Sequence, residues 1–212
     1  MGDDTMTGYV LYGYATAGSA AVEAAMVSAG IAFEFRDVNP ETGGLYDDAY
    51  RAVNPRQQVP TLVHPDGTVI TELPAILNHL ADAHPDSGLA PPPGSSARAH
   101  HDRWLAFLHA NVYEGILRMY YSERYTDDPA GAEAIHTAAK AYVARHLALF
   151  GDAVGDGPYL GGDTPTGADF LVWVVSTWLD PVELKAASPV VAALMHAMSA
   201  RPELADVVAR NT

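Results

Sequence analysis

One segment carries most of the residues suited to holding a ligand, and it reads QVPTLVHPDGTVITELPAIL over residues 58–77. Its Asp66-Gly67 pair separates two short apolar runs and predicts a β-hairpin, because glycine tolerates the positive φ of tight hairpin turns. Pro60 then falls at the start of a strand, where its missing N–H is tolerated. A cis bond there would leave the preceding backbone groups free to face a ligand, whereas a trans proline would make an ordinary loop.

Two other kinds of chemistry are disfavoured. The run His100-His101-Asp102 has metal-binding residue types, but consecutive residues on a helix diverge and no third ligand is evident, so we expect no metal. The chain has no cysteine, which excludes disulfides, thiolate metal sites and a cysteine nucleophile. Any thiol chemistry must therefore use a thiol that the substrate brings.

The composition narrows the class of protein. With 212 residues, of which 49% are hydrophobic, the chain can form a substantial core. The net charge of -14 would repel a phosphate backbone, so we expect no nucleic-acid partner. The longest apolar stretch, 170–179, is too short to span a membrane, and the N-terminal MGDDTMTG lacks an apolar signal core. We therefore expect a cytoplasmic protein without a membrane partner.

The elements that position the 58–77 segment follow from hydrophobic periodicity. The pattern predicts strands at 9–12 and 32–38, helices at 19–29, 46–53 and 74–84, and the hairpin, in the order β-α-β-α-β-β-α. Strands that alternate with helices indicate parallel pairing, with an antiparallel edge from the hairpin. The proline- and glycine-rich stretch 86–94 predicts a linker. Beyond it we expect only helices, at 96–121, 130–150, 167–179 and 190–200.

The sequence therefore predicts an α/β domain over 1–85, a linker over 86–94 and an all-helical domain over 95–212. NPRQQVPTL and TELPAI in the first domain resemble the N-P-x-G-Q-V-P-x-L and E-S-x-A-I motifs of the glutathione S-transferase family. GGDTPTGAD, at 161–169, is similar to its G-D-x-x-[ST]-x-A-D motif. There Thr166 and Asp169 have capping-box spacing, which predicts a structural role. The resemblance covers nearly the whole chain and implies a bacterial, cytosolic type with a thioredoxin-like first domain.

The resemblance also implies a site for glutathione. Val59 would supply backbone hydrogen bonds at Pro60, as an added strand does, with Gln58 and Asn54 as polar neighbours. Glu72 would meet the ammonium of the γ-glutamyl group; its alternative role is favourable electrostatics at a helix start.

Four positions depart from the family pattern. Leu73 stands where the family usually has the serine that grips the γ-glutamyl carboxylate. Asp37 stands where some bacterial members have lysine, Gly18 where beta-type members have cysteine, and Gln57 where glycine is usual. Leu73, Asp37 and Gly18 favour a protein that keeps the fold but not the chemistry, and Gln57 is expected to alter the loop before Pro60.

A donor near the first helix would stabilise the thiolate, which is the nucleophile. Ser19 is the first candidate, because helix N-termini favour anions, and its alternative role is the N-cap of that helix. Tyr14 is the second candidate; Thr16 and Tyr12 are the other hydroxyls, and Tyr12 is expected to pack in its strand.

The wall for a hydrophobic substrate is expected from Tyr12 and from the first long helix of the second domain. His109 and Tyr113 are one turn apart and share a face, and Tyr120 and Arg118 lie further along. Arg118 and Arg124 are candidates for pairing a ligand carboxylate or for surface salt bridges.

The leading hypothesis is an enzyme of detoxification type that conjugates glutathione, or a related thiol, to a hydrophobic electrophile between the domains. The alternatives are a non-catalytic binding or interaction protein, and a thiol-dependent reductase or isomerase on the same fold. The resemblance also implies a homodimer.

Overall fold

A computed structural model describes residues 8–211. The acidic N-terminal segment, on which the expectation about a signal core depends, lies almost wholly outside these residues. The chain forms two compact units, one from the chain up to Ala90 together with the stretch from Ser199 onward, and one from Pro91–Met198. The C-terminal stretch thus belongs with the first unit. The division into domains 1–85 and 95–212 stays a prediction.

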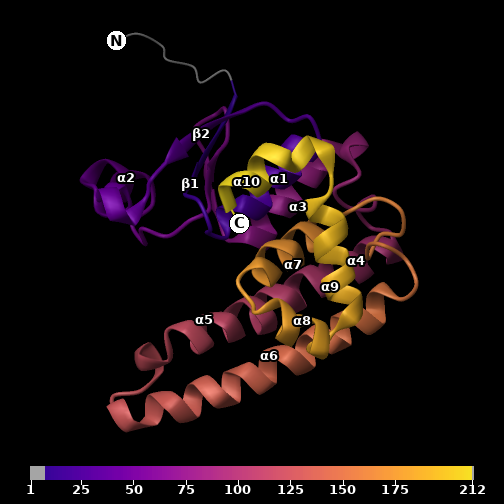
Figure 1. Cartoon of the computed structure of the whole chain (residues 1–212). Coiled ribbons are helices and arrows are strands. Elements are labelled where there is room, and N and C mark those ends of the chain that lie inside the picture. Colours follow the sequence, from indigo (N-terminus) through magenta and orange to yellow (C-terminus); the bar gives the residue numbers. More distant parts are fainter. Residues whose placement is uncertain (1–7, 212) are drawn as a thin grey trace. The chain divides into compact units, whose positions relative to one another are not determined.

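The first unit is built on a four-stranded sheet of order β2-β1-β3-β4, of which β1 and β2 are labelled side by side in Figure 1. Its strands are β1 (Tyr9–Gly13), β2 (Phe33–Asp37), β3 (Thr61–Val63) and β4 (Val69–Thr71). β1 and β2 pair in parallel, but β3 runs antiparallel to both β1 and β4. The expectation of parallel pairing therefore holds for one pair only, because the loop before Pro60 brings the chain back in the opposite direction.

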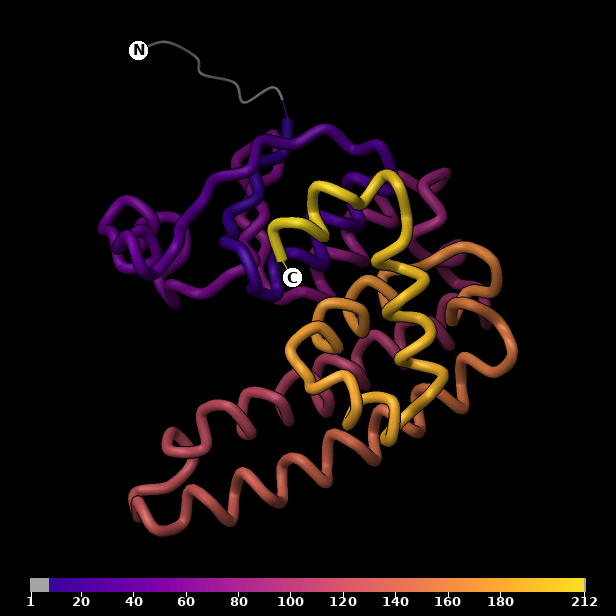
Figure 2. Tube along the Cα trace, viewed as in Figure 1, coloured from indigo at the N-terminus to yellow at the C-terminus, as the bar shows by residue number. Residues whose placement is uncertain are grey.

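Helices of the first unit are α1 (Ser19–Ser28), α2 (Asp48–Val53), α3 (Leu73–Ala83) and α10 (Ala205–Asn211). α1 packs against α3, and both bury apolar side chains such as Met26 and Ile76 completely. α10, which the sequence pattern did not indicate, packs on α1 (Figure 2). Seven residues give too short a pattern for a helix to be predicted from periodicity.

The second unit contains only helices among its described elements. They are α4 (Ser96–Phe107), a π-helical segment (Leu108–Tyr113), α5 (Glu114–Tyr120), α6 (Ala132–Val154), α7 (Gly167–Thr177), α8 (Pro181–Ala187) and α9 (Pro189–Ser199). The single helix predicted over 96–121 is thus interrupted by a π-helical segment.

Short 3-10 turns occur in both units. They occupy Pro40–Thr42, Gly44–Tyr46, Pro85–Ser87 and Pro202–Leu204 in the first unit, and Ser122–Tyr125 and Pro129–Gly131 in the second.

The predicted capping box forms at the start of α7. The carboxylate of Asp169 accepts hydrogen bonds from the Thr166 N–H at 2.7 Å and from the Leu160 N–H at 2.8 Å. In return, the Thr166 side chain accepts a hydrogen bond from the Asp169 N–H. Asp169 is fully buried, and burial raises its pKa above the ordinary value. The box therefore satisfies donors that water cannot reach, and the predicted capping-box hydrogen bonds are confirmed.

We predict that Asp169→Ala destabilises the protein by about 3 kcal/mol, because two buried N–H groups lose their acceptor. Urea unfolding followed by circular dichroism measures the change. Asp163→Ala, which removes an exposed carboxylate from the same loop, serves as the control and should shift stability by less than about 0.5 kcal/mol. Equal losses in the two variants would contradict the capping role.

Candidate functional site

The strand register gathers three loops at one end of the sheet. Tyr12 pairs with Thr61 across β1 and β3, and Thr61 pairs with Thr71 across β3 and β4. The loop after Gly13, the residues before Thr61 and the start of α3 after Thr71 therefore emerge side by side. Most thiol-binding and catalytic residues expected from the sequence lie in these loops.

The loop before β3 is held by a buried polar network. The Gln58 carbonyl accepts hydrogen bonds from the Tyr50 hydroxyl at 2.6 Å and from the Asn54 amide at 2.9 Å. The same amide also donates to the Thr61 hydroxyl at 2.9 Å. Asn54, which the sequence predicted as a polar neighbour of the ligand, is only 4% exposed. Its side chain therefore holds the loop in position from the interior of the protein. Burial raises the pKa of Tyr50, which keeps its hydroxyl a donor.

Val59 follows this network and precedes a cis bond to Pro60. Of the two isomers left open by the sequence, the structure has the cis one. Within residues 8–211, neither the N–H nor the C=O of Val59 bonds to another group of the protein. Backbone groups that stay without a protein partner are those that an extended ligand can use.

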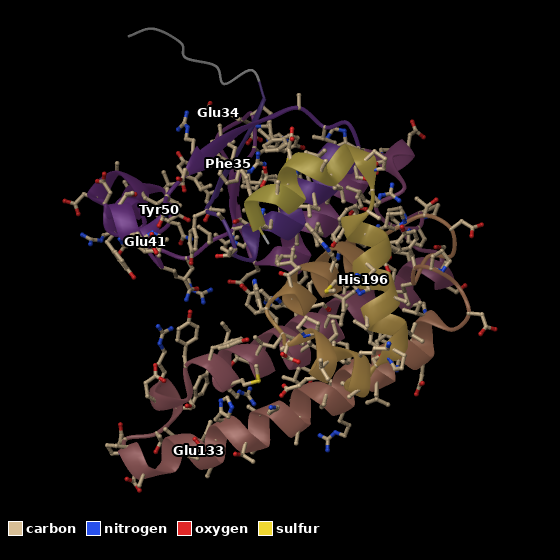
Figure 3. The ribbon with its side chains drawn as sticks, in the orientation of Figure 1. Glu34, Phe35, Glu41, Tyr50, Glu133 and His196 are labelled. Atoms are coloured by element: carbon tan, nitrogen blue, oxygen red, sulfur yellow. The ribbon has the colours of Figure 1, made fainter. Side chains whose placement is uncertain are left out.

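A small apolar cluster lies beneath this loop. Its buried members are Val38, Leu45 and Tyr50, and Tyr12, Tyr14 and Val59 pack against it. Tyr50, on α2, is labelled in Figure 3. The Tyr12 hydroxyl accepts a hydrogen bond from Arg36 at 2.9 Å, and its ring lies 5.2 Å from that of Tyr50. Tyr12 packs as expected for a strand residue, and the cluster brings the loops of Tyr14 and Val59 together.

At the start of α3, Glu72 occupies the N-cap position but makes no side-chain cap hydrogen bond. Its carboxylate instead pairs with Arg56. Leu73 is only 1% exposed, so its side chain contributes to the core. This position offers a ligand no side-chain hydroxyl, and the pair of Glu72 and Arg56 places two charged groups beside it.

Arg56 was missed by the sequence reasoning. The signal was available, since Arg56 lies in the same NPRQQVP motif as Val59. What no pattern supplied is the proximity of Arg56 to Glu72, sixteen residues further along the chain.

Ser19 does not cap α1. Gly18 is the N-cap residue, and the Ser19 hydroxyl donates to the Tyr14 carbonyl at 3.2 Å and lies 3.3 Å from the Tyr14 N–H. Ser19 is 1% exposed, and a Cβ on Gly13 would lie 2.5 Å from its side chain. The N-cap alternative is therefore wrong, and the hydroxyl closes the loop between β1 and α1. Its expected role as thiol activator stays a prediction.

Among residues 8–211, three residues other than glycine have positive φ, and each lies in one of the three loops. The φ angles are 63° at Thr16, 50° at Gln57 and 67° at Glu72. Such conformations cost about 1–3 kcal/mol each and cluster at binding and active sites. Their distribution makes this end of the sheet the candidate functional region of the first unit.

The expected substrate-wall residues of the helical unit lie in or near the π-helical segment. The His109 and Tyr113 rings are 5.4 Å apart, which confirms that they share a face. Tyr113 also meets Trp178 edge-on at 5.3 Å, and Tyr120 donates to the Trp178 carbonyl. Arg118 lies 3.5 Å from Glu114, as the salt-bridge alternative predicts.

Arg124 stacks over the Tyr121 ring at 4.0 Å, so its observed contact is a cation–π interaction. No ion pair of Arg124 is recorded among residues 8–211. Asp37, at the end of β2, is exposed.

Over the described range 8–211, no three His, Asp or Glu side chains are grouped so as to hold a metal ion. Of the His100-His101-Asp102 run, His101 is buried and lies 3.0 Å from Asp102 through Nδ1. In the same range no helix is both long and apolar enough to cross a membrane.

Comparisons with known proteins agree with this architecture. The family model for the glutathione S-transferase N-terminal domain matches residues 20–83, and that for the C-terminal domain matches residues 122–210. Glutathione S-transferase GstA of Escherichia coli O157:H7 is 32% identical over 162 residues, which are 76% of this chain and 77% of that protein.

Two solved structures are similar over nearly their whole length. A glutathione transferase homologue from Sulfitobacter, solved with bound glutathione, superposes with a TM-score of 0.84 at 26% identity, over 95% of this chain and 97% of the other. A glutathione transferase from Methylococcus capsulatus gives 0.79 at 30% identity, over 95% and 97%. The chain belongs to the glutathione S-transferase family, and the predicted fold of a thioredoxin-like domain followed by a helical domain is confirmed.

We predict that Ser19→Ala lowers the free energy of unfolding by about 1–2 kcal/mol, because the Tyr14 backbone loses the hydrogen bonds that the Ser19 hydroxyl makes with it. Urea denaturation measures the loss. Ser28→Ala, at the less buried end of the same helix, controls for serine replacement in α1. Unchanged stability in Ser19→Ala would show that this hydroxyl does not fix the loop.

Proposed function

We propose that this protein binds glutathione, or a closely related thiol, at the end of the sheet and conjugates it to an electrophile. The observation that carries the proposal is the unpaired main chain of Val59, beside the Arg56 and Glu72 charges. A γ-glutamyl peptide has a backbone that can bond to the Val59 main chain and a zwitterionic end that can meet the Arg56 and Glu72 charges. The glutathione bound to the Sulfitobacter homologue supports the same ligand.

The γ-glutamyl end would take the place of the Arg56–Glu72 ion pair. Its ammonium would meet Glu72, and its carboxylate would meet the guanidinium of Arg56, which offers five donors in a planar fork. This exchange compensates for Leu73, where the family usually has a serine hydroxyl. Both side chains are more than half exposed, at 62% and 51%, so a ligand can reach them.

The thiolate would be stabilised by the loop that precedes α1. The Ser19 hydroxyl is buried and already bonded to Tyr14, so the proposal assigns the donor role to the exposed Thr16 and the half-buried Tyr14. The N-terminus of α1 adds a favourable potential for an anion. The sulfur would form a bond to the electrophilic carbon as the leaving group departs with its electron pair, and the thiol proton would pass to solvent.

The electrophile would be held by the aromatic face of His109 and Tyr113, with Tyr120 and Arg118 nearby. A hydrophobic compound suits this face, because the two rings and that of Trp178 are in mutual contact. A homodimer in the cytoplasm, with a role in detoxification, completes the proposal.

A non-catalytic binding protein is the second candidate. It is favoured by one observation: the Ser19 hydroxyl is hydrogen-bonded to the Tyr14 backbone and so is already engaged within the protein. The two candidates share glutathione binding and differ in turnover, so they separate in a single assay with a chromogenic aryl halide.

We predict that Glu72→Gln binds glutathione about tenfold more weakly than the wild type, because a charge-assisted contact to the ammonium is lost. Isothermal titration calorimetry measures the affinity. Stability should change by less than about 0.5 kcal/mol, since the Arg56 pair is exposed.

Glu41→Gln neutralises an exposed carboxylate on another turn of the same unit and is the matched control. A wild type that does not bind millimolar glutathione would overturn the proposed function. Binding without turnover of the aryl halide would favour the second candidate.

A further inference from the structure

The C-terminal helix α10 reaches the loop to which the proposed function assigns the thiol. The Thr16 N–H donates to the Asn211 side-chain oxygen over 2.7 Å, across 195 positions of sequence. Asn211 is 7% exposed, and its amide donates to the Val207 carbonyl at 2.8 Å, which fixes the direction of the side chain. The side-chain oxygen of Asn211 is therefore oriented toward the loop that contains Thr16, although Asn211 itself lies on α10.

A second contact fixes α10 on the helix that this loop begins. Arg210, next to Asn211, pairs with Glu23, a buried carboxylate of α1. Burial raises the pKa of Glu23, and the Arg210 charge opposes that effect. Leu204 and Val207 are buried as well, at 0% and 2% exposure. Asn211 thus belongs to a helix that is fixed on α1 by an ion pair and by buried apolar side chains.

Thr16 needs such support. Its φ of 63° is unfavourable for a β-branched residue, which persists there only when its surroundings determine the conformation. The bond from Asn211 fixes the peptide N–H of this residue, whereas the Ser19 hydroxyl fixes the other side of the loop at Tyr14. Together the two bonds hold both ends of the segment 14–16.

We propose that Asn211 is a positioning residue of the thiol site, which holds Thr16 in the left-handed conformation from which its hydroxyl would meet the sulfur. This inference rests on the proposed function. Asn211 does not touch the thiol and acts through the Thr16 backbone, so its loss should change how well the site stabilises a thiolate more than how tightly the peptide binds.

The first test uses the ligand-free full-length protein and is independent of glutathione. Amide hydrogen exchange followed by NMR should show the Thr16 N–H at least about tenfold less protected in Asn211→Ala, with α4 and α7 unchanged. Asn211→Asp keeps the acceptor but loses the amide donor to the Val207 carbonyl, so its protection at Thr16 should fall between those of the wild type and Asn211→Ala. Asp206→Ala, an exposed position on α10, should match the wild type. Unchanged exchange at Thr16 in Asn211→Ala would overturn the proposal.

The second test is the pH dependence of turnover at saturating electrophile. In Asn211→Ala the apparent pKa of the bound thiol should rise by about one unit, and kcat/KM below that pKa should fall about tenfold with a small change in glutathione affinity. A profile identical to the wild type, alongside a lowered melting temperature, would assign Asn211 a structural role only.

Failure of the proposed function gives a different result. A wild type without glutathione binding or turnover overturns both the function and the thiol-site role, while the exchange measurement still decides whether Asn211 holds the loop.

Discussion

The functional end of the first unit depends on the hydrogen bonds that the Gln58 carbonyl accepts. Tyr50 and Asn54 donate to it from α2 and from the residue that follows α2, and both donors also meet the Thr61 hydroxyl at the start of β3. A buried network that is fully satisfied resists rearrangement, because each lost bond would leave a polar group without water. The network fixes the chain on both sides of Val59, and the main chain of Val59 is left for a ligand.

The same requirement for support recurs at two of the strained residues of the site. Gln57 donates to the Leu45 carbonyl at 2.9 Å and accepts from Arg51 at 3.2 Å. The Thr16 N–H is held by Asn211. In both cases the partner comes from another part of the chain. Local strain is thus balanced by contacts that only the folded unit provides.

This dependence explains what the sequence could predict. Periodic runs and the Asp-Gly turn identified β1 to β4 and α3 within a few residues, because those elements are encoded locally. The antiparallel hairpin of β3 and β4 was predicted, but the antiparallel pairing of β3 with β1 was not, since the direction of β3 depends on how α2 and the loop before Pro60 return the chain to the sheet. α10 was missed because its stability comes from packing on α1 and from Arg210, not from its own pattern.

The candidate site divides in the same way. Val59, Pro60 and Glu72 were identified through a local motif, and the structure brings them to one end of the sheet. Ser19 fits a helix-start pattern, but its environment also depends on Gly13, whose missing side chain lets the serine approach the strand. Asn211 could not be found from any pattern, because a lone asparagine near the end of a chain carries no signal.

The weakness of the Arg56–Glu72 ion pair is as important for the proposed ligand binding as the strength of the buried network before Val59. An exposed ion pair such as Arg56–Glu72 contributes about 0–1 kcal/mol to stability, because water already solvates both charges. A zwitterionic ligand that replaces it forms two charge-assisted contacts and gives up little. Had the pair been buried, separating its charges would have opposed binding. In the proposed complex the rigid network before Val59 and the exchangeable pair beside it would be complementary, since the first would fix the ligand backbone and the second would admit its charged end.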